Sequence, residues 1–218
     1  MQTMSALTVK RLAALLLLSI PVFPAWCAQA VAGDEAIERP PVRVGDVWVY
    51  RQTSLINNRK ESEFSYRVTA LGADRITTTA DGHRDVYSAD WNLIESSAGT
   101  KISPHEGYFS FPLEPGKSYP FKAVHTVARL RSTWEGTVSV QDWETIDVPA
   151  GRFRALRVNV AGSFGSGPVA RRAQLQHSYW WSAGVRRWVR HDLWMSKPDG
   201  KTADFHTRTE LIRYTPAP

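Results

Sequence analysis

Cysteine is almost absent from the 218-residue chain, where Cys27 is the single example. Because Cys27 falls in an N-terminal stretch that we predict to be removed, the remaining protein has no thiol. This excludes disulfides, cysteine nucleophiles and cysteine-ligated zinc. No apolar run approaches the roughly 20 residues of a membrane-spanning helix. We therefore expect a protein that is stabilised by its core alone and does not span a membrane.

The N-terminal stretch has the parts of a secretory signal peptide. Two basic residues precede the apolar run 12–23, and residues 28–30 read Ala-Gln-Ala, with small side chains at the two positions that signal peptidase reads. We predict a signal peptide at 1–30 and a periplasmic location. A lipid anchor on Cys27 is disfavoured, because Trp26 stands where lipoprotein processing needs a small residue.

Sustained helical periodicity is also missing after the signal peptide. The chain instead consists of short runs rich in Val, Thr, Tyr, Trp and Phe, separated by turn signals. This pattern predicts an all-β protein, with few or no helices after the signal peptide, built as an antiparallel meander. Strands are expected near 44–53, 61–70, 74–79, 84–90, 105–111, 118–130, 133–147, 152–161, 170–181, 185–196 and 203–214.

We expect the mature chain to hold one domain. Residues 31–41 end in two prolines, which lack a backbone donor, so they are predicted to form an extended, unpaired lead-in to a single β domain at 42–218. Residues 162–168 hold three glycines and a proline and are expected to form a flexible loop. Both faces of the first strand are apolar, which predicts a buried Trp48.

Motifs for catalysis are scarce. Neither Gly-x-Ser-x-Gly nor a phosphate-binding loop is present, and no two of the six histidines are closer than fourteen residues apart. A hairpin about Ala183 would bring His177 near His191, with Asp192 beside it. Such a pair could contribute to a metal site or could be two half-exposed strand histidines. We predict no catalytic residue, no metal site and no cofactor.

Arginine beside aromatic residues is the most suggestive chemistry. On a regular strand Arg186, Trp188 and Arg190 share one face, while Arg187 faces the other way with Val189. Guanidinium groups next to an indole bind anionic or sugar-like ligands, so these three residues are the predicted ligand-binding residues. The alternative is a solvated strand face on which arginine covers apolar surface.

Five motifs, taken in order, resemble the TapB-like family of exported bacterial proteins. They occupy residues 44–50, 111–119, 148–153, 179–185 and 210–214. The resemblance implies a curved antiparallel sheet, closed or half-closed like a barrel, in the bacterial envelope. No activity is assigned to that family, so no catalytic residue follows from the resemblance.

These observations lead to one functional hypothesis and two alternatives. The leading hypothesis is a soluble periplasmic protein without enzymatic activity that binds a small ligand or an envelope component on the concave face of its sheet. One alternative is an envelope hydrolase of a glycan or ester, and the other is a structural partner of an envelope or secretion assembly. The net charge of +6 is mild and predicts no nucleic-acid partner.

Overall fold

The computed structural model describes residues 36–166, 172–197 and 202–218, so the predicted signal peptide lies outside the described residues. Twelve strands and one short 3₁₀ helix, η2 (Ala183–Val185), make up the regular structure of these ranges. Among them no helix has the length and apolarity needed to cross a membrane. The strands are β1 (Val47–Ser54), β2 (Arg59–Leu71), β3 (Arg75–Ala80), β4 (His83–Ser88), β5 (Leu93–Glu95), β6 (Thr100–Ser103), β7 (Ser118–Val127), β8 (Leu130–Val148), β9 (Gly151–Gly165), β10 (Ala173–Ser182), β11 (Arg187–Ser196) and β12 (Ala203–Thr215).

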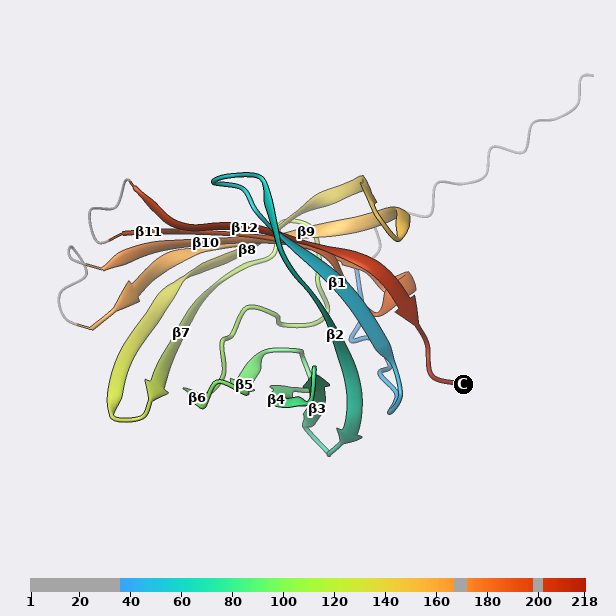
Figure 1. Ribbon diagram of the computed structural model, residues 1–218, viewed down its shortest axis with the longest axis horizontal. Coiled ribbons are helices and arrows are strands. Elements are labelled where there is room, and N and C mark those ends of the chain that lie inside the picture. Colours follow the sequence, from blue (N-terminus) through green and yellow to red (C-terminus); the bar gives the residue numbers. More distant parts are fainter. Residues whose placement is uncertain (1–35, 167–171, 198–201) are drawn as a thin grey trace, which may run out of the picture. The chain divides into compact units, whose positions relative to one another are not determined.

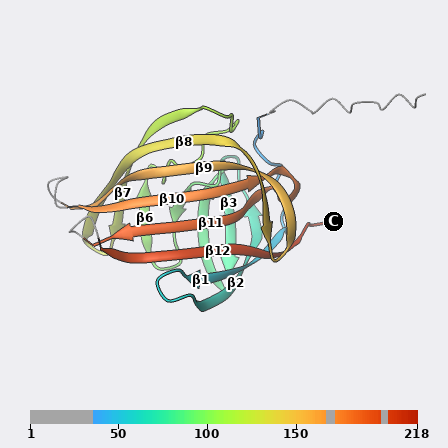
Figure 2. The same ribbon diagram turned by 90° about the horizontal axis from the view of Figure 1, so that it is seen from above.

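The strands form a closed antiparallel barrel in which each strand pairs with its neighbours along the chain. Closure occurs at β1, where Val47 pairs with Arg67 of β2 on one side and with Thr215 of β12 on the other. The long strands β8 to β12 lie side by side on one wall, as Figure 2 shows from above. The prediction of an all-β antiparallel meander with barrel-like closure is confirmed.

The two walls of the barrel differ in length. Strands β8 and β9 have 19 and 15 residues, whereas β5 and β6 have only 3 and 4. Figure 1 shows the long strands curving over the short ones, with loops between the two walls. The short strands leave part of the barrel interior to be filled by loop residues rather than by a continuous sheet.

Large aromatic side chains fill the interior, because alternate residues of each strand point inward. Trp48 and Tyr50 of β1 are fully buried, while the intervening Val49 is only half-buried. The Trp48 indole Nε1–H donates to the Val185 carbonyl at 2.7 Å, and the Tyr50 hydroxyl donates to the Trp188 carbonyl at 2.8 Å. The predicted burial of Trp48 is confirmed, and its polar atom is satisfied across the barrel.

Residues 105–111, which were predicted to form a strand, instead form part of a loop between β6 and β7 that packs inside the barrel. Tyr108 and Phe109 are buried there. The Asn92 side chain accepts from the Phe109 amide at 2.8 Å and donates to the Phe109 carbonyl at 2.7 Å. The backbone of this apolar segment is therefore satisfied by a side chain rather than by a strand ladder, which the sequence pattern does not distinguish.

Two other expectations need correction. The lead-in 31–41 is not wholly unpaired, because Ile37 is buried and forms a β-bridge with Leu113. The predicted loop at 162–168 begins too early, since Gly162 to Gly165 belong to β9 and the remainder largely lies outside the described residues. Gly162 stays in the ladder because it pairs with Gly136 of β8, where neither residue has a side chain.

Candidate functional site

The three predicted ligand-binding residues do not share one strand face. Arg190 of β11 pairs with Trp180 of β10, and Trp188 of β11 pairs with Trp181, the next residue of β10. Val189 is therefore an extra residue on β11 and forms a β-bulge. The bulge interrupts the alternation of side chains along β11. Arg186 precedes this strand and has a left-handed backbone with φ of 58°. The prediction of a common face is wrong because it assumed a regular strand.

Arg186 and Arg190 have partners within the protein. Arg186 Nη1 lies 3.5 Å from a carboxylate oxygen of Asp46, which is fully buried at one end of β1. The Arg190 guanidinium carbon lies 4.5 Å from the ring centroid of Trp180, and Nη2 lies 2.7 Å from Asp192. At Arg190 the arrangement matches the alternative interpretation, in which arginine covers apolar surface.

Arg187, which was expected to face away from the site, lies in the barrel interior with only 3% of its surface exposed. Its guanidinium carbon is 4.1 Å from the ring centroid of Tyr66 and 4.5 Å from that of Trp91. Four further ring centroids lie 5.3 to 5.8 Å away, those of Trp48, Tyr50, Tyr87 and Trp188. Attraction between the cation and these rings offsets part of the cost of removing it from water.

Two of the three guanidinium nitrogens of Arg187 lack a hydrogen-bond partner in the part of the chain that the structure describes. Its Nε and Nη1 atoms are buried and have no hydrogen-bond acceptor there, and no carboxylate forms an ion pair with it. Buried charges in proteins are normally paired or hydrogen-bonded. Arg187 is therefore a candidate binding residue, although the sequence pattern placed it on the face away from the predicted site.

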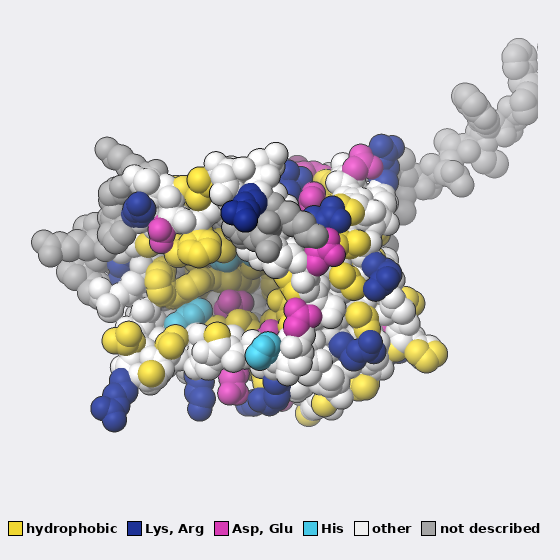
Figure 3. All heavy atoms as spheres, in the orientation of Figure 1, with side chains coloured by type: hydrophobic (Ala, Val, Ile, Leu, Met, Phe, Trp, Pro, Cys, Tyr) yellow, Lys and Arg dark blue, Asp and Glu magenta, His cyan; other side chains and the backbone are white. Residues whose placement is uncertain are grey.

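A cavity of about 140 Å³ lies beside Arg187. Its wall is mainly aromatic and includes Trp91 and Trp188. Its titratable groups are Glu106, Arg187, His191 and the hydroxyls of Tyr66, Tyr87 and Tyr179. Strands β2, β4, β10 and β11 and the loop segment between β6 and β7 all contribute to it. Figure 3 shows a hollow in this view with hydrophobic side chains gathered inside it. The concave interior of the barrel is thus the candidate site.

Glu106 has a perturbed titration. Burial is the main cause that raises its pKa to about 7, a hydrogen bond from the Leu93 backbone opposes the shift, and the negative charge of Asp85 adds to it. At neutral pH the carboxyl is therefore about half protonated. Sequence reasoning missed Glu106, because nothing in the local pattern shows that the segment around it enters the barrel.

The hairpin brings His177 and His191 together, as predicted. Nδ1 of His177 and Nε2 of His191 are 2.8 Å apart, and Tyr179 stacks on His191 with centroids 4.1 Å apart. Burial lowers the pKa of His191 to about 3 and that of His177 well below its usual range. Both rings are therefore neutral at pH 7, and one donates its N–H to the other. Among the described residues no three His, Cys, Asp or Glu side chains are grouped for a metal ion.

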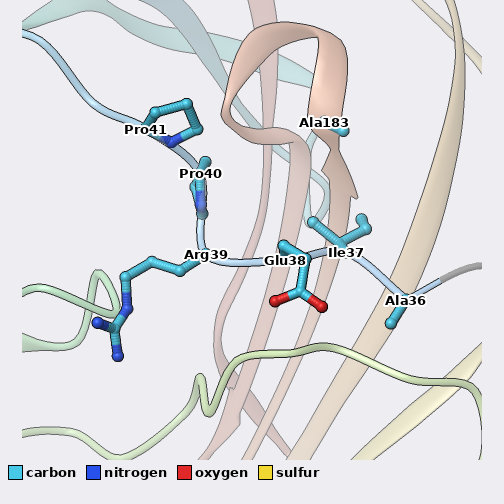
Figure 4. Close-up of a pocket in the computed structure, with 7 residues that line it drawn as sticks. All are labelled: Ala36, Ile37, Glu38, Arg39, Pro40, Pro41 and Ala183. Atoms are coloured by element: carbon cyan, nitrogen blue, oxygen red, sulfur yellow. The ribbon is translucent and has the colours of Figure 1, made fainter.

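A larger hollow of about 330 Å³ lies where the lead-in crosses η2. Figure 4 shows it between residues 36–41 and Ala183, and Ile37 and Glu38 are among the side chains that line it. The buried polar atoms without partners do not include any from these residues. Size alone therefore does not make this hollow the functional site, and the smaller cavity beside Arg187 is the stronger candidate.

Comparison with known proteins finds likeness in structure but not in sequence. No protein-family model matches the chain, and no curated protein matches it. A candidate lipoprotein from Parabacteroides distasonis aligns with a TM-score of 0.51 at 13% identity, over 83% of this chain and 100% of that one. The hypothetical lipoprotein YmcC from Escherichia coli aligns with a TM-score of 0.50 at 10% identity, over 79% and 85%. The likeness is one of fold alone. The resemblance to the TapB-like family stays a prediction.

Proposed function

We propose that this chain is an exported periplasmic protein that binds a small ligand in its barrel lumen and catalyses no reaction on it. The observation that carries the proposal is Arg187, a buried guanidinium with donors free of partners in the described chain, beside an aromatic-walled cavity. Ligand sites in proteins are typically apolar hollows with a few polar groups that orient the ligand. The lumen has this composition.

Export is supported by sequence and by the nature of the structural neighbours. Residues 1–30 carry the pattern of a signal peptide, and the motif order resembles the TapB-like exported family. The two neighbours named above are both described as lipoproteins. For this chain we propose export without a lipid anchor, because Trp26 precedes Cys27.

Lumen binding can be tested by titrating the purified full chain with benzyl alcohol and with benzoate while tryptophan fluorescence is recorded. Trp91 and Trp188 line the cavity, so a ring that enters it should change their emission. Leu93→Trp places a larger side chain at the cavity wall and should weaken binding of whichever probe binds. The matched control is Leu130→Trp, because Leu130 is 77% exposed and lies outside this cavity.

The outcomes separate the possibilities. A lumen site is supported if either probe binds saturably, if Leu93→Trp weakens that binding, and if Leu130→Trp leaves it unchanged. Absence of binding by both probes, or equal binding by the two variants, would exclude it.

An enzymatic function is the second candidate, and Glu106 is the observation that favours it. A carboxyl with a pKa near 7 is suited to proton transfer at neutral pH, and it shares the cavity with Arg187 and His191. The test is turnover of chromogenic esters and glycosides by the parent protein and by Glu106→Gln. Turnover that this substitution removes, while probe binding persists, would establish the hydrolase alternative over the binding protein.

A further inference from the structure

The unpartnered polar atoms at the cavity are all donors. Among the residues that line it, the buried polar atoms without a hydrogen-bond partner are Nε and Nη1 of Arg187 and Nε1 of Trp91. The Arg187 guanidinium lies over the Trp91 ring, so these donors belong to adjacent groups. A buried donor without an acceptor is costly, and a ligand that supplies acceptor oxygens would remove that cost.

Among the residues that line the cavity, Arg187 is the one Lys or Arg side chain and Glu106 is the one carboxyl. Asp85, whose charge acts on Glu106, does not itself line the cavity, and its carboxylate accepts the Ser97 amide N–H at 2.7 Å. Glu106 itself is about half neutral at pH 7, because burial raises its pKa to about 7. His177 and His191 are neutral. A ligand with a single negative charge would balance Arg187, whereas a doubly charged phosphate would leave a second charge buried and unpaired.

The volume limits the body of the ligand. A cavity of about 150 Å³ holds one benzene molecule in a protein core, and the lumen cavity measures about 140 Å³. Its wall offers the rings of Phe109, Tyr179 and Trp188, among others, for edge or offset contacts with another ring. One six-membered ring, or a short branched chain of the same volume, therefore fits in the cavity.

We propose that the ligand of the lumen is a small monocarboxylic acid with one aromatic ring or a comparably compact apolar body. This proposal rests on the proposed function and specifies the ligand class of the same site. The carboxylate accepts from Arg187 and from the Trp91 indole, since its two oxygens have lone pairs for several donors. The apolar body packs against the aromatic wall.

The experiment compares four probes on the full chain by isothermal titration calorimetry: benzoate, phenylacetate, benzamide and inorganic phosphate. Benzamide has the ring of benzoate without its charge, and phosphate has charge without an apolar body. We expect either acid to bind at least 10-fold more tightly than benzamide and than phosphate. This comparison needs no variant and so does not depend on how a substitution affects folding.

Variants then assign the preference to Arg187. Arg187→Met should weaken binding of the acid by about 30- to 100-fold, which corresponds to the loss of hydrogen bonds to a charged group. Arg187→Lys keeps the positive charge without the planar set of donors, so it should weaken binding of the acid less than Arg187→Met does. The matched control is Arg190→Met, three residues along the same strand, because Arg190 stacks on Trp180 and does not line the cavity.

Each result decides one question. Equal binding of benzoate and benzamide, or tightest binding of phosphate, would overturn the inference while a lumen site remains. An equal loss in Arg187→Met and Arg190→Met, with circular dichroism showing both folded, would also overturn it. Binding by none of the four probes would remove the proposed function together with this inference.

Discussion

A pair of glycines lets β8 and β9 lie too close together for a side chain at that point, and Gly136→Ala tests this packing. Gly136 of β8 pairs with Gly162 of β9. A Cβ on Gly136 would lie 2.1 Å from the Ala161 carbonyl oxygen and 2.5 Å from the Gly162 Cα, both of them backbone atoms. The two strands must therefore separate to accept a single methyl group.

The expected loss in the free energy of unfolding comes from the interactions that separating the two strands breaks. Two ladder hydrogen bonds at about 1 kcal/mol each, with about 1–3 kcal/mol of overpacking strain, give a loss of roughly 3–5 kcal/mol. Urea unfolding followed by tryptophan fluorescence would measure it, and thermal unfolding should shift by about 10 °C.

Gly72→Ala is the matched control. A Cβ there meets nothing closer than 3.8 Å, so the substitution should be neutral or should stabilise the protein by about 0.4–1 kcal/mol. If Gly136→Ala loses less than about 1 kcal/mol, the two strands can separate freely and the packing argument fails.

Three further predictions concern the core, the lumen and processing. Trp48→Ala should lower the free energy of unfolding by about 3–5 kcal/mol in urea, and a loss below about 1 kcal/mol would contradict its full burial. Folding raises the pKa of Glu106 from 4.5 to about 7. Its contribution to the free energy of unfolding is therefore fully present below pH 4.5 and is lost as the pH rises to 7. Glu106→Gln should therefore reduce the fall in stability between pH 4.5 and 7, by about 3 kcal/mol, and an unchanged pH profile would place the carboxyl in water. Intact mass should show that the exported protein begins at Val31, and a chain that retains Cys27 would contradict the predicted cleavage.

Local pattern was sufficient for much of the fold. Short β-rich runs between turn signals predicted an antiparallel meander, and Trp48 was correctly expected to be buried, because the alternation of a strand and the burial of its apolar face are properties of neighbouring residues. The turn at Ala183 predicted the meeting of His177 and His191 for the same reason. Both histidines lie within one hairpin, so no distant part of the chain is needed to bring them together.

The candidate site depended on contacts that only the closed barrel creates. The bulge at Val189 is a feature of how β11 pairs with β10, and it leaves Trp188 inside and Arg190 outside, although alternation along the chain predicts one face for both. Glu106 lines the cavity within a loop whose backbone is hydrogen-bonded by the side chains of Asn92 and Tyr119. The amino-acid sequence by itself therefore determined most of the long strands and the burial of Trp48, whereas tertiary structure decided which charged side chains share the cavity. The physical reason is that strand alternation is a local property, while a buried charge is placed by the packing of strands distant in sequence.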